Sequence, residues 1–481
     1  MNAPATDDLP VLVIGAGPVG LAAAAHLADR GIRFRVLEAG PLPANAVRAW
    51  RHVQLFSPWR YNIDQAARRL LEAAGWPAPD PDDIPTGAEL VQAYLEPLAK
   101  SPALEPHISY NTTVAAISRL DTDRLRTAGR DQAPFVVRTA DGEETLARAV
   151  IDASGTWNTP NTIGANGLPA KGERDAADRI EYGIPDVLGA DRDRYAGRAT
   201  IVIGAGHSAA TVLLGLAELV DQVPETRVTW AIRASSPSGA YGGEGADALP
   251  ARGALGAGLR MLAETGRITL VPSFSVREVT VSRDGPLTLV AAGREVTADR
   301  VIAVTGFRPE HTIAQELRLN LDPILGTTPL LAPLIDPNQH SCGTVRPHGV
   351  DELAQPEPGY FIVGMKSYGR ASTFLLATGH EQARSVVAAL DGDWTAAREV
   401  QLDLPETGVC SATVAAKALT DRLGLGPDIP ARLLEATSRH LGTSPSAAEA
   451  VLAGAKELGI DRATALQLAA FAAAQFDAPQ G

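Results

Sequence analysis

The chain has 481 residues, of which 45% are hydrophobic, and this length is sufficient for two or three globular domains. Acidic residues outnumber basic ones by 56 to 43, and the net charge of −13 argues against a nucleic-acid-binding surface. The two cysteines, Cys342 and Cys410, are too few for a disulfide scaffold and do not form a Cys-x-x-Cys redox pair.

The first residues lack the features of an export signal. Residues 1–9 contain neither a basic region nor a long apolar stretch, and a predicted strand follows at once. The longest apolar stretches, such as residues 466–476, are shorter than a membrane span. We therefore expect a cytoplasmic protein with no membrane segment and no nucleic-acid partner.

A glycine-rich turn near the N-terminus is the clearest motif of the chain. The apolar residues 11–14 predict a buried strand, and a turn and a helix (residues 21–30) follow it. In such a turn the first glycine permits a sharp bend, the second lets a diphosphate approach the backbone, and the third lets the helix pack closely on the strand. The ligand-binding candidates in this turn are Gly15, Gly17, Pro18 and Gly20.

An acidic residue stands where it would complete a dinucleotide site. The second predicted strand, residues 34–37, ends in Glu38, at the position where such folds bind the ribose hydroxyls of an adenine dinucleotide. Strand, turn, helix and acid occur in the order that this interpretation needs. A turn that only packs a helix, without a ligand, is the alternative.

Residues 40–85 are predicted to form a long irregular region with many aromatic side chains. These side chains either build a small core beneath the loop or form a wall over a cofactor or substrate, and both interpretations stay open. The aromatic residues are Trp50, Phe56, Trp59, Tyr61 and Trp76. The predicted elements that follow are a helix over 87–98, strands near 108–110 and 113–117, a hairpin around Asp141-Gly142, and a strand over 149–153 that leads into a turn at Gly155.

The same pattern begins again near residue 200. After a segment, 161–196, that we interpret as an interdomain linker, an apolar strand breaks into a second glycine turn and a helix follows over 211–220. This second unit ends in residues 305–309, which mirror the strand end at 152–155. The repeat predicts two dinucleotide sites in one chain. The candidates in the second turn are Gly204, Gly206, His207, Ser208 and Ala209.

Together these motifs resemble those of flavoproteins with two dinucleotide-binding domains, and within these they are most similar to bacterial flavin-containing monooxygenase-like oxidoreductases. The resemblance covers about residues 8–390, and it implies FAD on the first turn, with Glu38 at its ribose, and a nicotinamide cofactor on the second. The motifs that carry it are the two glycine turns with Glu38, residues 154–160 and residues 305–309. Further FAD-binding candidates are Val114, Gly155 and Gly364.

We expect an α/β fold with two Rossmann-like three-layer dinucleotide-binding domains, the second inserted in the first, and a small C-terminal helical appendix. The appendix is interpreted as a cap or as a contact between copies in a homo-oligomer. The predicted ranges are 1–160 and 311–395 for the two parts of the FAD-binding domain, 161–310 for the NAD(P)-binding domain with its linker, and 396–481 for the helical appendix.

Two further positions concern the cofactors. Arg233 follows the second strand of the second unit, where its guanidinium would pair with a 2′-phosphate, and this favours NADPH over NADH; an ordinary surface arginine is the alternative. Ser372 and Thr373 stand at the predicted start of a helix over 372–390, whose positive end would stabilise the anionic reduced flavin ring. Both residues are equally compatible with helix capping.

A polar loop at residues 336–349 brings His340, Cys342 and His348 close together in sequence. These three residues are one ligand short of a structural zinc site, and we predict no metal. A substrate-facing loop with His340 or His348 as acid–base and Cys342 as a thiol contact is one interpretation. An ordinary surface loop is the other.

Two departures from the related families keep the reaction open. Residues 178–185 contain no histidine where flavin-containing monooxygenases carry one, and the chain lacks the redox-active cysteine pair of disulfide reductases. We predict an FAD-dependent, NADPH-consuming oxidoreductase, with monooxygenation of a small molecule by O2 as the leading outcome. A reductase without oxygen insertion and a non-enzymatic nucleotide-bound sensor remain as alternatives.

Overall fold

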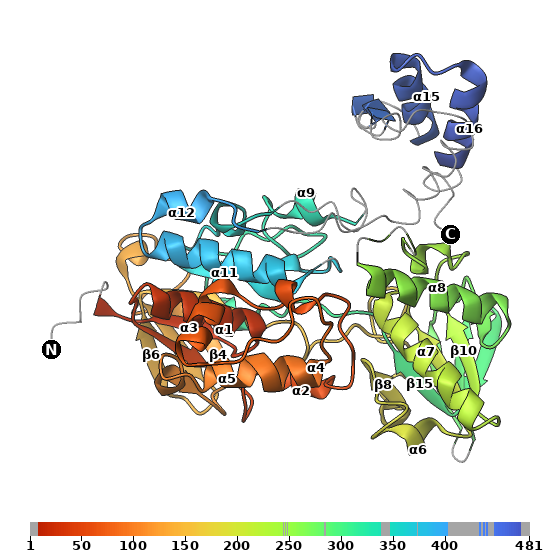
Figure 1. Ribbon diagram of the computed structural model, residues 1–481, viewed down its shortest axis with the longest axis horizontal. Coiled ribbons are helices and arrows are strands. Elements are labelled where there is room, and N and C mark those ends of the chain that lie inside the picture. Colours follow the sequence, from red (N-terminus) through yellow and green to blue (C-terminus); the bar gives the residue numbers. More distant parts are fainter. Residues whose placement is uncertain are drawn as a thin grey trace.

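The computed structural model describes residues 8–243, 245, 247, 249–282, 285–337, 347–372, 374–402, 432–433, 436–437, 439–440 and 447–472. Its two main parts are α/β units, each built around a parallel sheet, and they lie beside one another (Figure 1). Within the described part of the chain, no helix is both long and apolar enough to cross a membrane.

The first sheet has five parallel strands in the order β16-β7-β1-β2-β3. Its central strand consists of four fully or nearly fully buried apolar residues, which explains its position between two neighbours. The strands are β1 (Val11–Ile14), β2 (Phe34–Leu37), β3 (Ile108–Ser109), β7 (Ala149–Asp152) and β16 (Tyr360–Ile362).

Helices and a small antiparallel sheet cover the two faces of this first sheet. Helix α1 (Pro18–Asp29) packs on α11 (Leu376–Leu390) and on α3 (Gln65–Ala73), and these helices belong to the core on one face. On the other face lies the antiparallel sheet of β4 (Val114–Arg119), β5 (Phe135–Thr139) and β6 (Glu144–Ala147). The result is the predicted three-layer arrangement.

The second sheet repeats this topology. Its order is β11-β10-β9-β15-β8, so that β9 corresponds to β1 and β15 to β7. Helices α7 (His207–Gln222) and α8 (Pro250–Glu264) cover one face, and the antiparallel strands β12 (Glu278–Val281), β13 (Leu287–Ala291) and β14 (Arg294–Ala298) cover the other. The parallel strands are β8 (Ile180–Tyr182), β9 (Ala199–Ile203), β10 (Arg227–Ala231), β11 (Thr269–Val271) and β15 (Arg300–Ala303). The predicted α/β class with two Rossmann-like units is therefore confirmed.

One strand of the second sheet comes from the segment that was predicted to be a linker. β8 pairs with β15 in parallel, with Ile302 opposite Glu181, and it holds the position that β16 holds in the first sheet. Residues 161–196 are thus not only a linker, because they supply the fifth strand of the second unit. This strand precedes the rest of the second unit in the chain, because the chain returns to the first unit after β15 and offers no later described segment for the second sheet.

The two chain segments that connect the units run side by side. Asn161 donates its backbone N–H to the carbonyl oxygen of Gly306 at 2.9 Å, and Arg308 donates its backbone N–H to the carbonyl oxygen of Thr159 at 3.0 Å. The Nε of Arg308 also donates to Oδ1 of Asn161 at 2.9 Å. Trp157 stacks on Phe307 with ring centroids 5.2 Å apart. The connection between the units is therefore a short pair of antiparallel segments that are hydrogen-bonded to each other.

Several predicted boundaries differ from the structure. α1 and α7 begin at Pro18 and His207, directly after the glycine turns, and therefore earlier than predicted. α11 begins at Leu376, four residues after its predicted start. The region 40–85 is not irregular throughout, because it contains helix α3. Asp64 caps this helix by accepting the N–H of Ala67.

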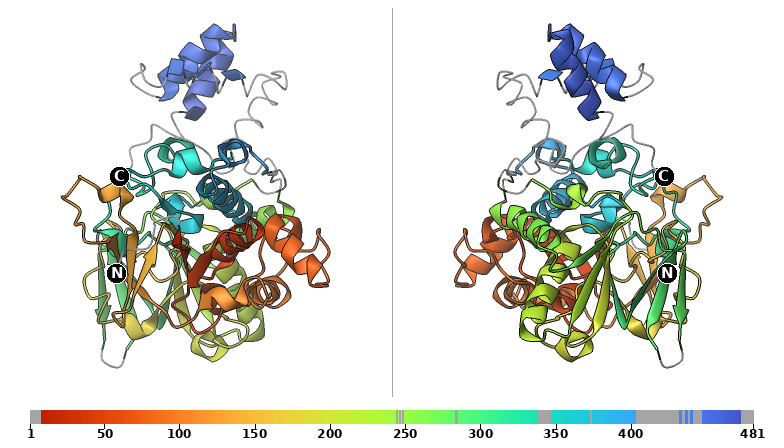
Figure 2. Two further views of the ribbon diagram at one scale, coloured as in Figure 1. Left: turned by 90° about the vertical axis from the view of Figure 1, so that its left-hand side faces the viewer. Right: turned by 90° about the vertical axis from the view of Figure 1, so that its right-hand side faces the viewer.

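The remaining elements are short or peripheral. Helices α15 (Ala447–Glu457) and α16 (Arg462–Ala472) pack on each other and stand away from both sheets (Figure 2). The other α-helices are α2 (Asn45–Ala49), α4 (Gly87–Glu89), α5 (Glu96–Ala99), α6 (Arg192–Tyr195), α9 (Ala332–Ile335), α10 (Val350–Leu353) and α12 (Trp394–Arg398). A π-helix over Leu90–Leu95 joins α4 to α5, and 3₁₀ segments occupy Trp59–Tyr61, Glu105–His107, Arg130–Gln132, Ala177–Arg179, Ser238–Ala240, Thr312–Ala314 and Gly364–Tyr368.

Candidate dinucleotide sites and the interdomain cavity

The first glycine turn has the packing that a diphosphate site requires. Gly15 has φ +96°, and a Cβ there would lie 2.8 Å from the carbonyl oxygen of Ala153. A Cβ on Gly20 would lie only 2.0 Å from the carbonyl oxygen of Gly15. Gly17 differs, since a Cβ there meets no atom of the described residues within 4 Å. Two glycines are thus required by packing, whereas Gly17 leaves open space in front of the helix.

Helix α1 presents its N-terminus to this open space. It begins at Pro18 without a side-chain cap, so that its first free N–H groups and the positive end of its dipole are available to an anion. Gly155, which also has an open Cβ position, lies in the turn after β7, and the neighbouring Ser154 Cα is 3.3 Å from a Cβ built on Gly15. The residues present therefore fit a dinucleotide diphosphate.

Glu38 is fixed at the end of β2 by backbone groups. Its Oε2 accepts the N–H of Ala16 at 2.7 Å, and its Oε1 accepts the N–H of Gly40 at 2.7 Å. Its carbonyl oxygen accepts the N–H of Thr112 at 2.8 Å, which brings the start of β4, with the predicted candidate Val114, next to the acid. Each carboxylate oxygen keeps a lone pair that can accept a ribose hydroxyl.

The second turn has the same construction. A Cβ on Gly204 would lie 2.3 Å from the carbonyl oxygen of Val304, whereas one on Gly206 would meet nothing within 4 Å. The indole N–H of Trp230 donates to the carbonyl oxygen of Gly204 at 2.7 Å and holds the turn against β10. His207 and Ser208 are exposed at the uncapped start of α7, and Ala209 is buried beneath them. These residues fit a second diphosphate.

Arg233 lies two residues beyond the end of β10, as the sequence predicts. Its side chain is exposed, and its guanidinium donates to the carbonyl oxygen of Ala165 at 3.2 Å. One backbone bond of this kind leaves other donors of the guanidinium available. The position suits a 2′-phosphate, and the role itself stays a prediction.

A buried ion pair joins the strand end beside the first turn to the segment after β16. The ammonium of Lys366 lies 2.7 Å from Oδ2 of Asp152 and 3.1 Å from Oγ of Ser154. The hydroxyl of Tyr360 donates to the same carboxylate at 2.9 Å. The side chains of Lys366 and Asp152 are 2% and 0% exposed. The sequence predictions did not include this cluster.

The electrostatics of this cluster follow from its burial. Burial alone would raise the pKa of Asp152, but the charge of Lys366 and the hydrogen bonds from Lys366 and Ser154 outweigh it and lower the pKa below its ordinary value. His311 stands close by, and burial and the charge of Lys366 lower its pKa. Neither ring nitrogen of His311 has a well-formed hydrogen bond with the described residues. The ammonium thus holds Asp152 ionised directly behind the first turn.

Gly364 and His348 belong to a second buried network. Oε1 of Gln382 accepts the N–H of Gly364 at 2.8 Å, and its Nε2 lies 2.9 Å from Nε2 of His348. Gln382 is fully buried, and His348 is only 3% exposed. Through Gln382, α11 therefore holds the glycine that follows β16. The burial of His348 favours a positioning role over contact with a substrate, and its predicted acid–base role stays untested.

For the remaining predicted site residues, the structure describes only some of the positions. His340, Cys342 and Thr373 lie outside the described residues. Ser372 is exposed and precedes α11, whose N-cap is Leu375, so that Ser372 does not begin the helix as predicted. Among the described residues, no cluster of three His, Cys, Asp or Glu side chains has the arrangement of a metal site.

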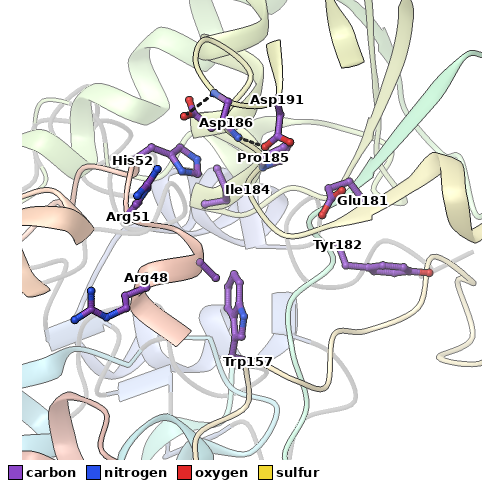
Figure 3. Close-up of a pocket in the computed structure, with 12 residues that line it drawn as sticks. Arg48, Arg51, His52, Trp157, Glu181, Tyr182, Ile184, Pro185, Asp186 and Asp191 are labelled. Atoms are coloured by element: carbon purple, nitrogen blue, oxygen red, sulfur yellow. Dashed lines mark hydrogen bonds between the residues drawn. The ribbon is translucent and has the colours of Figure 1, made fainter. Parts of the chain in front are cut away.

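A cavity of about 220 Å³ lies between the two units (Figure 3). The first unit contributes Arg48, Ala49, Arg51 and His52, which follow Glu38 in the chain, and Trp157, which follows Gly155. The second unit contributes the end of β8 and the loop after it. The lining residues there are Glu181, Tyr182, Ile184, Pro185, Asp186, Ala190 and Asp191.

The aromatic residues of region 40–85 divide between the two interpretations. Trp59 is buried in the core of the first unit, and Trp50 and Trp76 pack against that core. Phe56, by contrast, reaches the second unit, where its ring lies 5.5 Å from that of His207 at the second glycine turn. Arg51 and His52, in the same loop, line the cavity. In the sequence, the only indication of this role is that both residues lie between the two predicted dinucleotide motifs.

Comparison with known proteins places the chain among flavoenzymes. Residues 12–331 match the family described as pyridine nucleotide-disulphide oxidoreductase. A ferredoxin–NADP reductase of Verminephrobacter eiseniae is 27% identical over 383 residues, which are 79% of this chain and 89% of that protein. The indole-3-pyruvate monooxygenase YUCCA1 of rice (Oryza sativa subsp. japonica) is 29% identical over 210 residues, 43% of this chain and 44% of that protein.

The fold itself has solved counterparts. A double mutant of a flavin monooxygenase from Stenotrophomonas maltophilia superposes with a TM-score of 0.54 at 24% identity, covering 80% of this chain and 98% of that one. The chain spans about half the length, 44% to 53%, of several other curated relatives that it matches.

The relatives thus divide between monooxygenases and reductases, while FAD and NAD(P) binding are common to the family. The match covers both glycine turns and the connection between the two units. The chain therefore belongs to the pyridine nucleotide-disulphide oxidoreductase family and is an FAD- and NAD(P)-dependent oxidoreductase.

Proposed function

We propose that the chain is an NADPH-dependent flavin monooxygenase that oxidises a small molecule with O2. The observation that carries this proposal is the cavity between the two units, because it is small, lined by both domains and furnished with charged, aromatic and titratable side chains. A site of this kind suits a small substrate rather than a protein electron carrier, which needs an open surface.

Each part of the machinery has named residues. The free N–H groups at the start of α1 would hold the FAD diphosphate, and Glu38 would hold the ribose. When bound, FAD accepts two electrons from NADPH and delivers them to oxygen. The start of α7 would hold the NADPH diphosphate, and the exposed Arg233 would pair with its 2′-phosphate. Trp157, stacked on Phe307, would shield one side of the cavity from water.

A reductase that passes electrons to an external acceptor, without oxygen insertion, is the second candidate. A relative that matches most of both chains supports it, since that protein is named a ferredoxin–NADP reductase. A dithiol relay has little support, because Cys342 and Cys410 lie far apart in the sequence and do not form a Cys-x-x-Cys pair.

The stoichiometry of the reaction separates the two candidates. A monooxygenase converts substrate, NADPH, H⁺ and O2 into oxygenated substrate, NADP⁺ and H2O, so that NADPH, O2 and product change in equal amounts and label from ¹⁸O2 enters the product. The reductase instead transfers electrons from NADPH to ferredoxin or a dye acceptor without incorporating label. If NADPH does not bleach the flavin of the purified protein, both candidates are refuted.

A further inference from the structure

Charged side chains line both walls of the cavity between the units, and on each wall one of them has no ion pair with any described residue. On the wall of the first unit, the guanidinium of Arg48 is neutralised by Glu96 at 2.9 Å. Arg51, on the same wall, is exposed and makes no ion pair with any described residue. Next to it, Nε2 of His52 is buried without a hydrogen-bond partner in the described structure. This wall therefore offers donors to an anionic group.

The wall of the second unit has the opposite character. Glu181 is neutralised by Arg194 at 2.8 Å, and the same guanidinium lies 3.4 Å from Asp191. Asp186 accepts only the backbone N–H of Ala190 through its side chain, and it has no ion pair among the residues described. A carboxylate with free lone pairs at a cavity is an acceptor for an ammonium or a hydroxyl group.

The same cavity also has an apolar surface. Trp157 is stacked on Phe307, and Gly183 lies near Cη2 at the edge of the indole, where a Cβ on Gly183 would lie 3.5 Å from that atom. Ile184 contributes an aliphatic side chain to the same cavity (Figure 3). Because its ring is held in this way, Trp157 is a rigid platform against which a planar or aliphatic group can pack.

We propose that this cavity binds a small zwitterionic substrate of the amino-acid class, with the carboxylate at Arg51 and His52, the ammonium at Asp186 and the apolar part on Trp157. The assignment rests on the proposed function, which it deepens by naming the substrate class. The volume of about 220 Å³ lies below the range of about 300–1,000 Å³ that is usual for pockets with drug-sized ligands, and this favours a ligand of the size of a single amino acid. A ligand with only one of the two charges would leave the other wall unpaired.

Three compounds that share a phenyl ring test this assignment on the full-length, FAD-loaded protein. L-Phenylalanine carries both charges, phenethylamine only the ammonium and 3-phenylpropionate only the carboxylate. We expect phenylalanine to bind at least about tenfold more tightly than either of the others, since a hydrogen bond to a charged group contributes a factor of this size. Binding is measured by calorimetry and by quenching of tryptophan fluorescence, without NADPH.

Two variants locate the charges. Arg51→Gln is expected to weaken phenylalanine and phenylpropionate by about tenfold and to leave phenethylamine unchanged. Asp186→Asn is expected to weaken phenylalanine and phenethylamine and to leave phenylpropionate unchanged. The exposed residues Arg68 and Asp175, outside the cavity, supply the matched controls R68Q and D175N, which are expected to change none of the three affinities.

The outcomes distinguish this proposal from the function on which it rests. If phenethylamine or phenylpropionate binds as tightly as phenylalanine, or none of the three binds, the zwitterion assignment is wrong, although bleaching by NADPH still supports the oxidoreductase. If Arg51→Gln and Asp186→Asn change the affinity for NADPH instead, the cavity belongs to the nicotinamide. If the double variant of the ligand-free protein loses less thermal stability than the sum of the losses in the two single variants, the two side chains pair with each other. This result also overturns the proposal.

Discussion

The ion pair of Lys366 and Asp152 gives the sharpest test of how the first unit is held together. Lys366→Met removes the ammonium and keeps a flexible side chain of similar length. It leaves the carboxylate of Asp152, which is 0% exposed, with only Tyr360 and Ser154 as hydrogen-bond partners. Removal of one partner of a buried pair costs about 3–5 kcal/mol. We expect a loss of this size in the free energy of unfolding of the first unit at pH 7.

The dependence of this loss on pH has a defined sign. In the variant, burial is no longer offset by Lys366, so the pKa of Asp152 rises above its unfolded value. A carboxyl whose pKa is raised on folding destabilises the fold most at high pH, and the penalty shrinks as the pH falls through that pKa. The gap between Lys366→Met and the unaltered protein should therefore narrow towards acidic pH.

The assay is urea denaturation followed by flavin fluorescence, which would report release of FAD from the first unit, where we propose that it binds. The double variant Lys366→Met with Asp152→Asn should recover most of the loss at pH 7, because replacement of a whole buried pair is often nearly neutral. Lys171→Met is the matched control, since Lys171 is 79% exposed and pairs with Glu278 at the surface, where a pair contributes about 0–1 kcal/mol. If Lys366→Met is as stable as Lys171→Met at every pH, the reasoning is refuted.

Three further outcomes are expected. Gly17→Ala should yield a folded protein that binds FAD poorly, whereas Gly20→Ala should lower the melting temperature, because only the second substitution places a methyl group against the backbone. Absorbance at 450 nm measures the bound FAD and circular dichroism the melting temperature, and equal melting temperatures of the two variants would contradict the packing. Arg233→Gln should raise the KM for NADPH about tenfold or more and leave the kinetics with NADH unchanged, and a parallel change with both cofactors would exclude the phosphate contact. Burial lowers the pKa of His380 to about 4, opposed by Asp64, so the unfolded chain takes up a proton first as the pH falls from about 6.5 to 4. The contribution of His380 should lower the stability by about 3 kcal/mol over this range, and His380→Gln should reduce the slope in urea titrations at each pH by this amount; an unchanged slope would contradict it.

The glycine turns and Glu38 were predictable because their signals are local. A buried strand, a turn with two packed glycines and one open glycine, and an acid at the end of the next strand all lie within about 30 residues. The helix starts were predicted too late, since Pro18 and His207 follow the turns directly and give no separate signal.

The residues that the sequence did not reveal depend on contacts between distant segments. β8 has only three residues, and its position in the sheet becomes clear only when β15, more than a hundred residues later, pairs with it. Lys366 and Asp152 are 214 residues apart, and each alone resembles an ordinary charged residue at the end of a strand. The one available signal was an acid at the end of an otherwise apolar strand, where a buried partner is required.

The inserted topology also sets the order in which the chain can fold as it is synthesised. Every strand of the second sheet lies between residues 180 and 303, so this domain is complete before β16 has been made. The first domain waits for β16 to occupy the edge of its sheet and for α11 to cover α1, which requires the chain up to residue 390. Domains fold as units, and the usual sequence starts from the N-terminus. Here the second unit is completed first, and the first unit, although its central strand is encoded near the start of the chain, is completed later.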